Sequence, residues 1–276
     1  MRSVLVALCA IGWATASAGA FAAECPGNPS ALGTARVIAV DPAEHARVGS
    51  LQYAETLPLD EREVVLTFDD GPLPPHTDRV LDILKAECVK ATFFSVGMMA
   101  RAYPQVLQRA AAEGHTIGTH TQTHPLRMAR VSNERARWEI DQGIASVAAA
   151  LDDFRALAPF LRIPGLGRTQ QIEDYAQSGG LMVWSGDVGA DDWRRIGPDQ
   201  VTARTLARLE RKGRGIIVLH DIHARTVAAL PGLIDEFKRR GFRIVHVVQA
   251  GAEQPKTATT AAQWAAHRPG KPAGGE

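Results

Sequence analysis

The chain has 276 residues, of which 45% are hydrophobic and 22% charged, a composition typical of a globular protein long enough for one large α/β domain. Its formal net charge is only +1, which excludes the strongly basic surface that attracts nucleic acid or an acidic membrane. We therefore expect no nucleic-acid partner, and a substrate that is neutral or of mixed charge.

The N-terminus has the pattern of a secretory signal peptide. Arg2 gives a positive start, residues 4–13 are mostly apolar, and residues 20–23 (Ala-Phe-Ala-Ala) form an A-x-A-like cleavage site. The apolar run is too short to span a bilayer comfortably, although an uncleaved N-terminal anchor is the alternative interpretation. We therefore predict a signal peptide over residues 1–23, export to the periplasm or the exterior, and no stable membrane insertion after cleavage.

Three cysteines are present, and Cys9 leaves with the predicted signal peptide. Cys25 and Cys88 then remain in a compartment that permits disulfides. A bridge between the N-terminal arm, residues 24–61, and the end of the first predicted helix is one possibility, and two unpaired thiols are the other. Neither cysteine has a ligand-like neighbour, so we assign neither to a metal.

Strand-like and helix-like patterns alternate from residue 62 to residue 250. The predicted strands cover residues 63–68, 91–96, 115–118, 160–163, 181–184, 215–219 and 242–248. The predicted helices cover residues 78–87, 104–113, 133–151, 170–178, 200–212 and 226–240. About seven strand–helix units in one run imply parallel strands with helices outside, arranged as an open sheet or as a barrel.

Two segments flank this single predicted domain. In the N-terminal arm, residues 36–40 are expected to form one strand of a small hairpin. After Gly251 the chain is rich in Ala, Thr, Gly, Pro and Lys, which predicts a disordered tail over residues 251–276.

Polar side chains stand at or just past the ends of the predicted strands. They are Asp69 and Asp70 on the first strand, His120 and His124 on the third, Arg162 on the fourth, Asp192 on the fifth and His220 on the sixth. The carboxyl ends of parallel strands in a barrel meet at one face, so we expect one shared site. One Asp and two His can hold a divalent transition metal and leave positions for water and substrate.

The two histidines can bind one metal only if the backbone between them has a suitable conformation. His120 and His124 can meet on one metal if the segment makes a helical turn, which Pro125 would end, whereas an extended strand would hold them too far apart. Asp69-Asp70-Gly71-Pro72 alone is also typical of a simple turn. Taken with the histidines, it predicts a metal-dependent hydrolase in which one Asp binds the metal and the other is free to act as a base.

Five separated motifs occur in order between residues 62 and 248. They are Thr67-Phe-Asp-Asp-Gly71, His120-Thr-Gln-Thr-His124, Arg162-Ile-Pro-Gly165, Asp192-Trp193 and Val218-Leu-His220. Together they resemble carbohydrate esterase family 4, the NodB-type polysaccharide deacetylases. The resemblance implies an α/β fold, a distorted (β/α)7-type barrel, with a bound divalent metal that is usually zinc. It also implies hydrolysis of N- or O-acetyl groups on glycans such as chitin oligomers and peptidoglycan.

Carried over motif by motif, the resemblance makes Asp69 the general base and Asp70, His120 and His124 the metal ligands. Arg162 would pair with Asp69 and keep it ionised and oriented.

The remaining motifs imply roles for the acid and for substrate contacts. His220 would be the general acid, since imidazole titrates near the working pH. Asp192 would support it, although the motif's spacing is one residue longer than usual and Asp191 is the alternative. Trp193 would line the site, or else pack in the core.

Three further residues would contact the acyl group. Gly165 stands where the family has an aromatic residue, and its backbone N–H would bind the oxyanion. Val218 and Leu219 would form a small apolar pocket for the acetyl methyl group.

The predicted function is therefore metal-dependent removal of N-acetyl groups from a glycan by an exported, monomeric protein. One alternative is an O-acetyl esterase or a non-sugar amide hydrolase that uses the same site. Another is a glycan-binding relative that keeps the fold without turnover.

Overall fold

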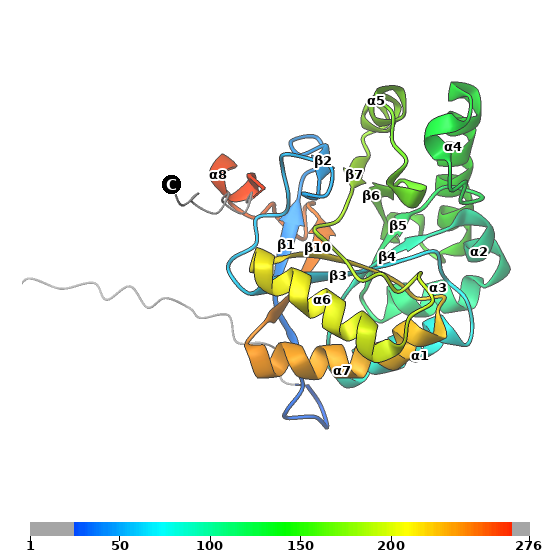
Figure 1. Ribbon diagram of the computed structural model, residues 1–276. Coiled ribbons are helices and arrows are strands. Elements are labelled where there is room, and N and C mark those ends of the chain that lie inside the picture. The colour runs from blue at the N-terminus through cyan, green and yellow to red at the C-terminus, as the bar shows by residue number, and fades with distance from the viewer. Residues whose placement is uncertain (1–24, 267–276) are drawn as a thin grey trace, which may run out of the picture.

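The computed structural model of the protein describes residues 25–266 (Figure 1). The predicted signal peptide lies outside the described residues. None of the helices within residues 25–266 combines the length and the apolar character needed to cross a membrane.

Within residues 25–266, ten strands form one sheet in which every pair of strands is parallel. The strands are β1 (Thr34–Val40), β2 (Arg47–Val48), β3 (Glu63–Asp69), β4 (Thr92–Ser95), β5 (Thr116–Thr119), β6 (Leu157–Arg162), β7 (Met182–Trp184), β8 (Val188–Gly189), β9 (Gly215–His220) and β10 (Arg243–Gln249). Pairing runs from β8 through β9, β3, β4, β5 and β6 to β7. Among the described strands no pairing joins β7 to β8, so the ring is open there. The predicted α/β fold, a distorted barrel, is confirmed.

Helices cover the outer face of this barrel, with α6 and α7 side by side across one part of it (Figure 1). The helices are α1 (His76–Ala86), α2 (Gly97–Ala102), α3 (Pro104–Ala112), α4 (Asn133–Ala150), α5 (Gln170–Ser178), α6 (Pro198–Lys212), α7 (Ala224–Arg240) and α8 (Ala261–Trp264). Short 3-10 turns lie at Met128–Arg130, Phe154–Ala156 and Pro164–Leu166. The sequence did not predict α2, because it is too short to show helical periodicity before Pro104 starts α3.

Alternation along the strands decides which side chains enter the barrel. On β3, Leu66 and Phe68 belong to the core that packs against the helices, whereas Val65 belongs to a second core inside the barrel. Side chains along a strand point alternately to opposite faces, so Asp69 shares the inner face with Val65. The same alternation brings Arg162 of β6 and His220 of β9 to the inside of the barrel.

The N-terminal arm does not form the predicted hairpin. Instead β1 pairs in parallel with β10, and β2 pairs in parallel with β7, so the arm adds strands to the main sheet. A strand here buries Ile38 and Val40 and saturates the outer edge of β10, which a separate hairpin would leave open. A disulfide joins Cys25 to Cys88 and ties the start of the arm to the end of α1.

The prediction of a disordered tail is wrong for residues 257–266. The backbone N–H of Thr257 donates to the carbonyl of Ala39 at 3.0 Å. Trp264 of α8 is only 3% exposed and stacks on the ring of His45 at 3.4 Å between centroids. One buried tryptophan therefore anchors a segment whose low-complexity composition shows no pattern, and residues 267–276 lie outside the described part of the chain.

Candidate active site and metal centre

The predicted catalytic residues meet at the carboxyl end of the barrel. Asp69, the last residue of β3, is the register partner of His220, the last residue of β9. Both line a pocket of about 490 Å³ together with Asp70, His120 and His124. Residues that are far apart in the sequence therefore surround one pocket, as expected from their positions at the ends of the predicted strands.

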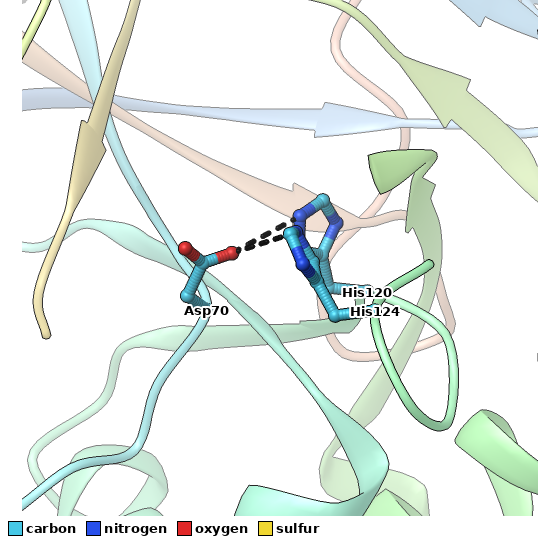
Figure 2. Close-up of side chains that lie close together, drawn as sticks. All are labelled: Asp70, His120 and His124. Carbon is cyan, nitrogen blue, oxygen red and sulfur yellow. Dashed lines mark ion pairs between the residues drawn. The ribbon is translucent and has the colours of Figure 1, made fainter. Parts of the chain in front are cut away.

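Three side chains in this pocket form a set that fits a divalent cation. Nε2 of His124 and Nε2 of His120 lie 3.1 Å and 3.4 Å from Oδ1 of Asp70, and their donor atoms all lie within 4.8 Å of one another (Figure 2). Oδ1 of Asp70 is buried without a hydrogen bond from the described residues. Two nitrogens and one carboxylate oxygen are donors that zinc and similar cations prefer.

Protonation also suits this set. Nδ1 of His120 lies 2.6 Å from the carbonyl oxygen of Arg162 and donates to it, which leaves Nε2 free to bind a metal. Burial opposes ionisation of Asp70, but the neighbouring imidazoles outweigh it and hold the pKa of this carboxyl well below its ordinary value. Asp70 therefore presents an anionic oxygen to the position between the two imidazoles.

The loop that carries the two histidines is not the predicted helical turn. Thr121 and His124 both have left-handed backbone, with φ of 64° and 56°, and no helix spans residues 120–124. These two residues bend the loop so that the imidazole rings come within 4.9 Å of each other. Left-handed conformations at residues other than glycine cannot be read from the sequence, and they cost about 1–3 kcal/mol each.

Glu139 of α4, which the sequence analysis did not single out, holds this loop. Its side chain is fully buried and accepts hydrogen bonds from the backbone N–H groups of Gln122 at 3.0 Å and Thr123 at 2.8 Å. It also accepts from the hydroxyl of Thr123 and from Arg135, whose nitrogen lies 2.6 Å away. A buried carboxylate with this many donors fixes the segment between the two histidines.

Arg162 is fully buried inside the barrel and pairs with Asp69, as predicted. Its NH1 donates to Oδ1 of Asp69 at 2.6 Å and to the hydroxyl of Thr67 at 2.7 Å, and its NH2 donates to the carbonyl of Ser185 at 3.0 Å. The guanidinium lies 4.2 Å from the centroid of the Phe94 ring. A buried guanidinium at this distance fixes the orientation of the Asp69 side chain.

His220 is supported by Asp192 and not by Asp191. Oδ1 of Asp192 lies 2.7 Å from Nδ1 of His220, and Oδ2 accepts from the backbone N–H of His220 and the hydroxyl of Thr226, each at 2.7 Å. Burial lowers the pKa of His220, but the hydrogen bond and charge of Asp192 outweigh it and raise that pKa to about 9. Asp191 instead pairs with Arg204 at 2.9 Å and Arg208 at 2.8 Å.

A second buried carboxylate holds the turn that follows β3. Asp221 accepts hydrogen bonds from the N–H of Gly71 at 3.1 Å and from the hydroxyl of Thr77 at 2.6 Å. Burial raises the pKa of Asp221 to about 7. Both loops that carry the candidate metal ligands are therefore fixed by carboxylates that the sequence analysis did not assign.

The residues predicted to contact substrate divide into two groups. Gly165, Trp193 and Val218 line the pocket. Trp193 is 58% exposed, which excludes the alternative that it packs in the core. Leu219 belongs instead to the core between barrel and helices, because its side chain points to the opposite face from Val218 on β9. The prediction that Leu219 lines the acetyl pocket is therefore wrong.

The pocket has a charged side and an apolar side. We call the residues at the strand ends, Asp69, Asp70 and His220, the strand side. The loop side consists of large apolar residues from four loops, outside the predicted strands and helices: Leu51, Leu126, Leu166 and Trp193. The sequence analysis identified only Trp193 among them, since the other three belong to no motif.

Groups that can bind a cation, accept a proton and donate one meet in this pocket, as hydrolysis of an unactivated acyl bond requires. The fold and the site thus define the class of protein, a metal-dependent hydrolase.

Comparison with known proteins gives the family. The sequence model of the polysaccharide deacetylase family matches residues 56–184. A peptidoglycan-N-acetylglucosamine deacetylase of Bacillus cereus is 31% identical over 189 residues, which cover 66% of this chain and 68% of the relative. A chitooligosaccharide deacetylase of Sinorhizobium fredii is 36% identical over 213 residues, covering 70% of this chain and 95% of the relative.

The solved structures agree with this. A peptidoglycan deacetylase of Bdellovibrio bacteriovorus aligns with a TM-score of 0.69 at 29% identity, and the match covers 79% of this chain and 60% of that one. The chain belongs to the polysaccharide deacetylases of carbohydrate esterase family 4. Members of this family are divalent-metal-dependent hydrolases that remove N-acetyl groups from glycans, and this protein is a hydrolase of that kind.

Proposed function

We propose that the protein releases acetate from N-acetylglucosamine residues of peptidoglycan or of a chitooligosaccharide, with zinc as its metal. The observation that carries this proposal is the convergence of Asp69, His220 and the metal-binding set on one pocket. The names of the relatives supply the two candidate polymers. One carboxylate and two imidazoles form a donor set that suits zinc, which supports the choice of metal.

In the proposed reaction, Asp70, His120 and His124 would hold the cation, which would supply Lewis-acid polarisation of the acyl carbonyl. Asp69 accepts a proton from the attacking water, whose oxygen forms the new bond to the carbonyl carbon. Arg162 holds the side chain of Asp69 in place for this step through its 2.6 Å contact.

The second half of the reaction requires a proton donor. The backbone N–H of Gly165 would donate to the oxygen that becomes negative in the tetrahedral state. The carbon–nitrogen bond then breaks, and His220 delivers its proton to the leaving amine, so that acetate and a free amino sugar are the products. The raised pKa of His220, about 9, keeps this imidazole protonated at neutral pH.

We also propose that the protein works outside the cytoplasm as a monomer. The disulfide between Cys25 and Cys88 supports an oxidising compartment, and the N-terminal sequence supports export.

The experiment that tests the function uses the zinc-loaded protein without residues 1–23. Acetate release is measured from chitopentaose, from peptidoglycan and from an O-acetylated glycan, with and without a chelator. We expect chelator-sensitive acetate from at least one of the two N-acetylated polymers. Acetate from the O-acetylated glycan alone would favour the esterase alternative, and no acetate from any substrate would favour the binding-only alternative.

The variant Asp69→Asn tests the proposed base. We expect acetate release to fall by about 10³-fold, because general-base catalysis contributes roughly 10²–10⁴-fold and the amide cannot accept the proton. Zinc stoichiometry should stay at one per chain, since Asp69 is not among the proposed ligands. Turnover close to that of the parent protein would remove Asp69 as the base.

A further inference from the structure

The residues of segment Gly49–Tyr53 precede the part of the chain that matches the family, residues 56–184, and lie outside all five motifs. We propose that this segment belongs to the substrate site. Leu51 limits the size of the acyl group, and Gln52 is a positioning residue for the turn that contains Gly165. The proposal rests on the deacetylase function and names two residues that determine its specificity and rate.

The segment is fixed to the barrel by a buried carboxylate. Asp187 accepts hydrogen bonds from the N–H of Ser50 at 2.7 Å and from the Ser50 hydroxyl through one oxygen. Its other oxygen accepts from the hydroxyl of Thr56 at 2.7 Å and from the N–H of Ile216 at 2.8 Å. Asp187 is buried and links the segment directly to β9, the strand that ends at His220.

The backbone next to Asp187 brings Leu51 to the pocket. The N–H of Leu51 donates to the carbonyl of Gly186 at 2.9 Å. A methyl group added at Gly186 would lie 2.3 Å from Cγ2 of Val218 and 3.5 Å from Cδ1 of Leu51. The two side chains therefore converge above Gly186, where the absence of a side chain leaves them room.

Leu51 lines the pocket and is 49% exposed, so its side chain is accessible to a molecule that enters the pocket. Val218, the residue it approaches, is the one proposed to contact the acetyl methyl group. A larger acyl group would have to extend past both side chains. One methylene in an apolar pocket changes kcat/KM by roughly 10–200-fold, so a single leucine can set an acyl-size limit.

Gln52 acts on the neighbouring turn. Its Nε2 donates to the carbonyl oxygen of Leu166 at 2.8 Å. Gly165 and Leu166 have consecutive left-handed backbone, with φ of 57° and 53°. Such a conformation is unfavourable for leucine and persists where surrounding contacts hold it. Gln52 supplies one of these contacts from a distant part of the chain, and so fixes the backbone of the proposed oxyanion donor.

The test of Leu51 measures release of acetate and of propionate from chitopentaose and from its N-propionyl analogue, using the zinc-loaded full mature chain. Leu51→Ala should raise the ratio of kcat/KM for propionyl over acetyl about five-fold or more. Leu51→Phe should lower that ratio. Val37→Ala, which removes an exposed aliphatic side chain from β1 outside the pocket, is the matched control and should leave the ratio unchanged.

The outcomes separate the two levels of the proposal. Suppose that the parent protein releases acetate and that both Leu51 variants have the same propionyl-to-acetyl ratio of kcat/KM as the parent protein. The acyl-size role of Leu51 is then wrong, while the deacetylase function stands. If the parent protein releases no acetate, the deacetylase function fails and the inference with it.

Gln52→Met tests the positioning role, because it removes the donor and keeps the length of the side chain. We expect kcat to fall on the order of ten-fold with KM almost unchanged, since an oxyanion donor acts mainly in the transition state. A rise in KM without loss of kcat would mean that Gln52 supports substrate binding only. An unchanged kcat would overturn the positioning role.

Discussion

On the strand side of the pocket, the proposed base and the proposed acid are each fixed by a buried partner from another element. Arg162 holds Asp69, and Asp192 holds His220, with oxygen–nitrogen distances of 2.6 Å and 2.7 Å. On the loop side, the apolar side chains stay accessible, and Trp193 is 58% exposed. Chemistry needs charges in a fixed orientation, whereas substrate recognition needs apolar surface that the substrate itself covers. Substitutions on the two sides should therefore affect different kinetic constants.

Among the substitutions that test this difference between the two sides, we expect the largest effect on kcat for Asp192→Asn. Loss of the carboxylate charge should lower the pKa of His220 from about 9 toward the ordinary 6.5 of an imidazole. The protonated acid is lost as pH rises through this pKa, so the alkaline limb of kcat/KM should move to lower pH. At neutral pH we expect about 100-fold lower kcat.

Asp191→Asn is the matched control for that pH profile. Asp191 is the neighbouring carboxylate, but it pairs with Arg204 and Arg208 and makes no contact with His220 among the hydrogen bonds of the described residues. The alkaline limb of kcat/KM in Asp191→Asn should therefore lie at the same pH as in the parent protein. A shift in Asp191→Asn and none in Asp192→Asn would reverse the assignment of the supporting residue.

The second effect concerns metal binding and is expected for Glu139→Gln. The amide keeps the size of the side chain but loses the charge that accepts hydrogen bonds from Gln122, Thr123 and Arg135. Partners behind metal ligands typically contribute 10–100-fold to metal affinity, so we expect zinc to bind about 10- to 100-fold more weakly. Competition with a chromogenic chelator measures this without any substrate.

Glu63→Gln provides the control for the chelator experiment. Glu63 is equally buried, but it stands at the start of β3, at the opposite end of the barrel, where it accepts from Arg36 at 2.6 Å. The variant Glu63→Gln should lose stability as Glu139→Gln does, but it should keep the zinc affinity of the parent protein. Equal zinc affinity in the parent protein and in Glu139→Gln would show that the loop holds its shape without the buried carboxylate.

The contrast between the strand side and the loop side also explains which site residues could be predicted from the sequence. Asp69, Arg162 and His220 could be predicted because each directly ends a buried strand, and alternation along that strand decides where its side chain points. Glu139 could not, because a glutamate in a polar helix resembles any solvent-exposed residue until the loop it holds is known. Leu51 follows no periodic pattern, and its segment is brought to the pocket by the pairing of β2 with β7 and by the hydrogen bonds to Asp187.

The conformation of the histidine loop was also beyond the sequence. The spacing of His120 and His124 required convergence, and a helical turn is the common way to achieve it. The chain converges instead through left-handed backbone at Thr121 and His124, which the buried Glu139 stabilises. Such a choice depends on a contact with a residue 16 positions away, so no local pattern can indicate it.

The smallest effect should come from the loop side, with Trp193→Ala. Its exposed ring can cover a sugar face, and loss of about 1 kcal/mol of aromatic contact corresponds to roughly a five-fold higher KM. The kcat value should stay within about two-fold, because the ring would contact substrate and transition state alike. Trp138→Ala is the control, since Trp138 of α4 is also exposed and does not line the pocket. A fall in kcat with unchanged KM in Trp193→Ala would instead place this residue with the catalytic groups of the strand side.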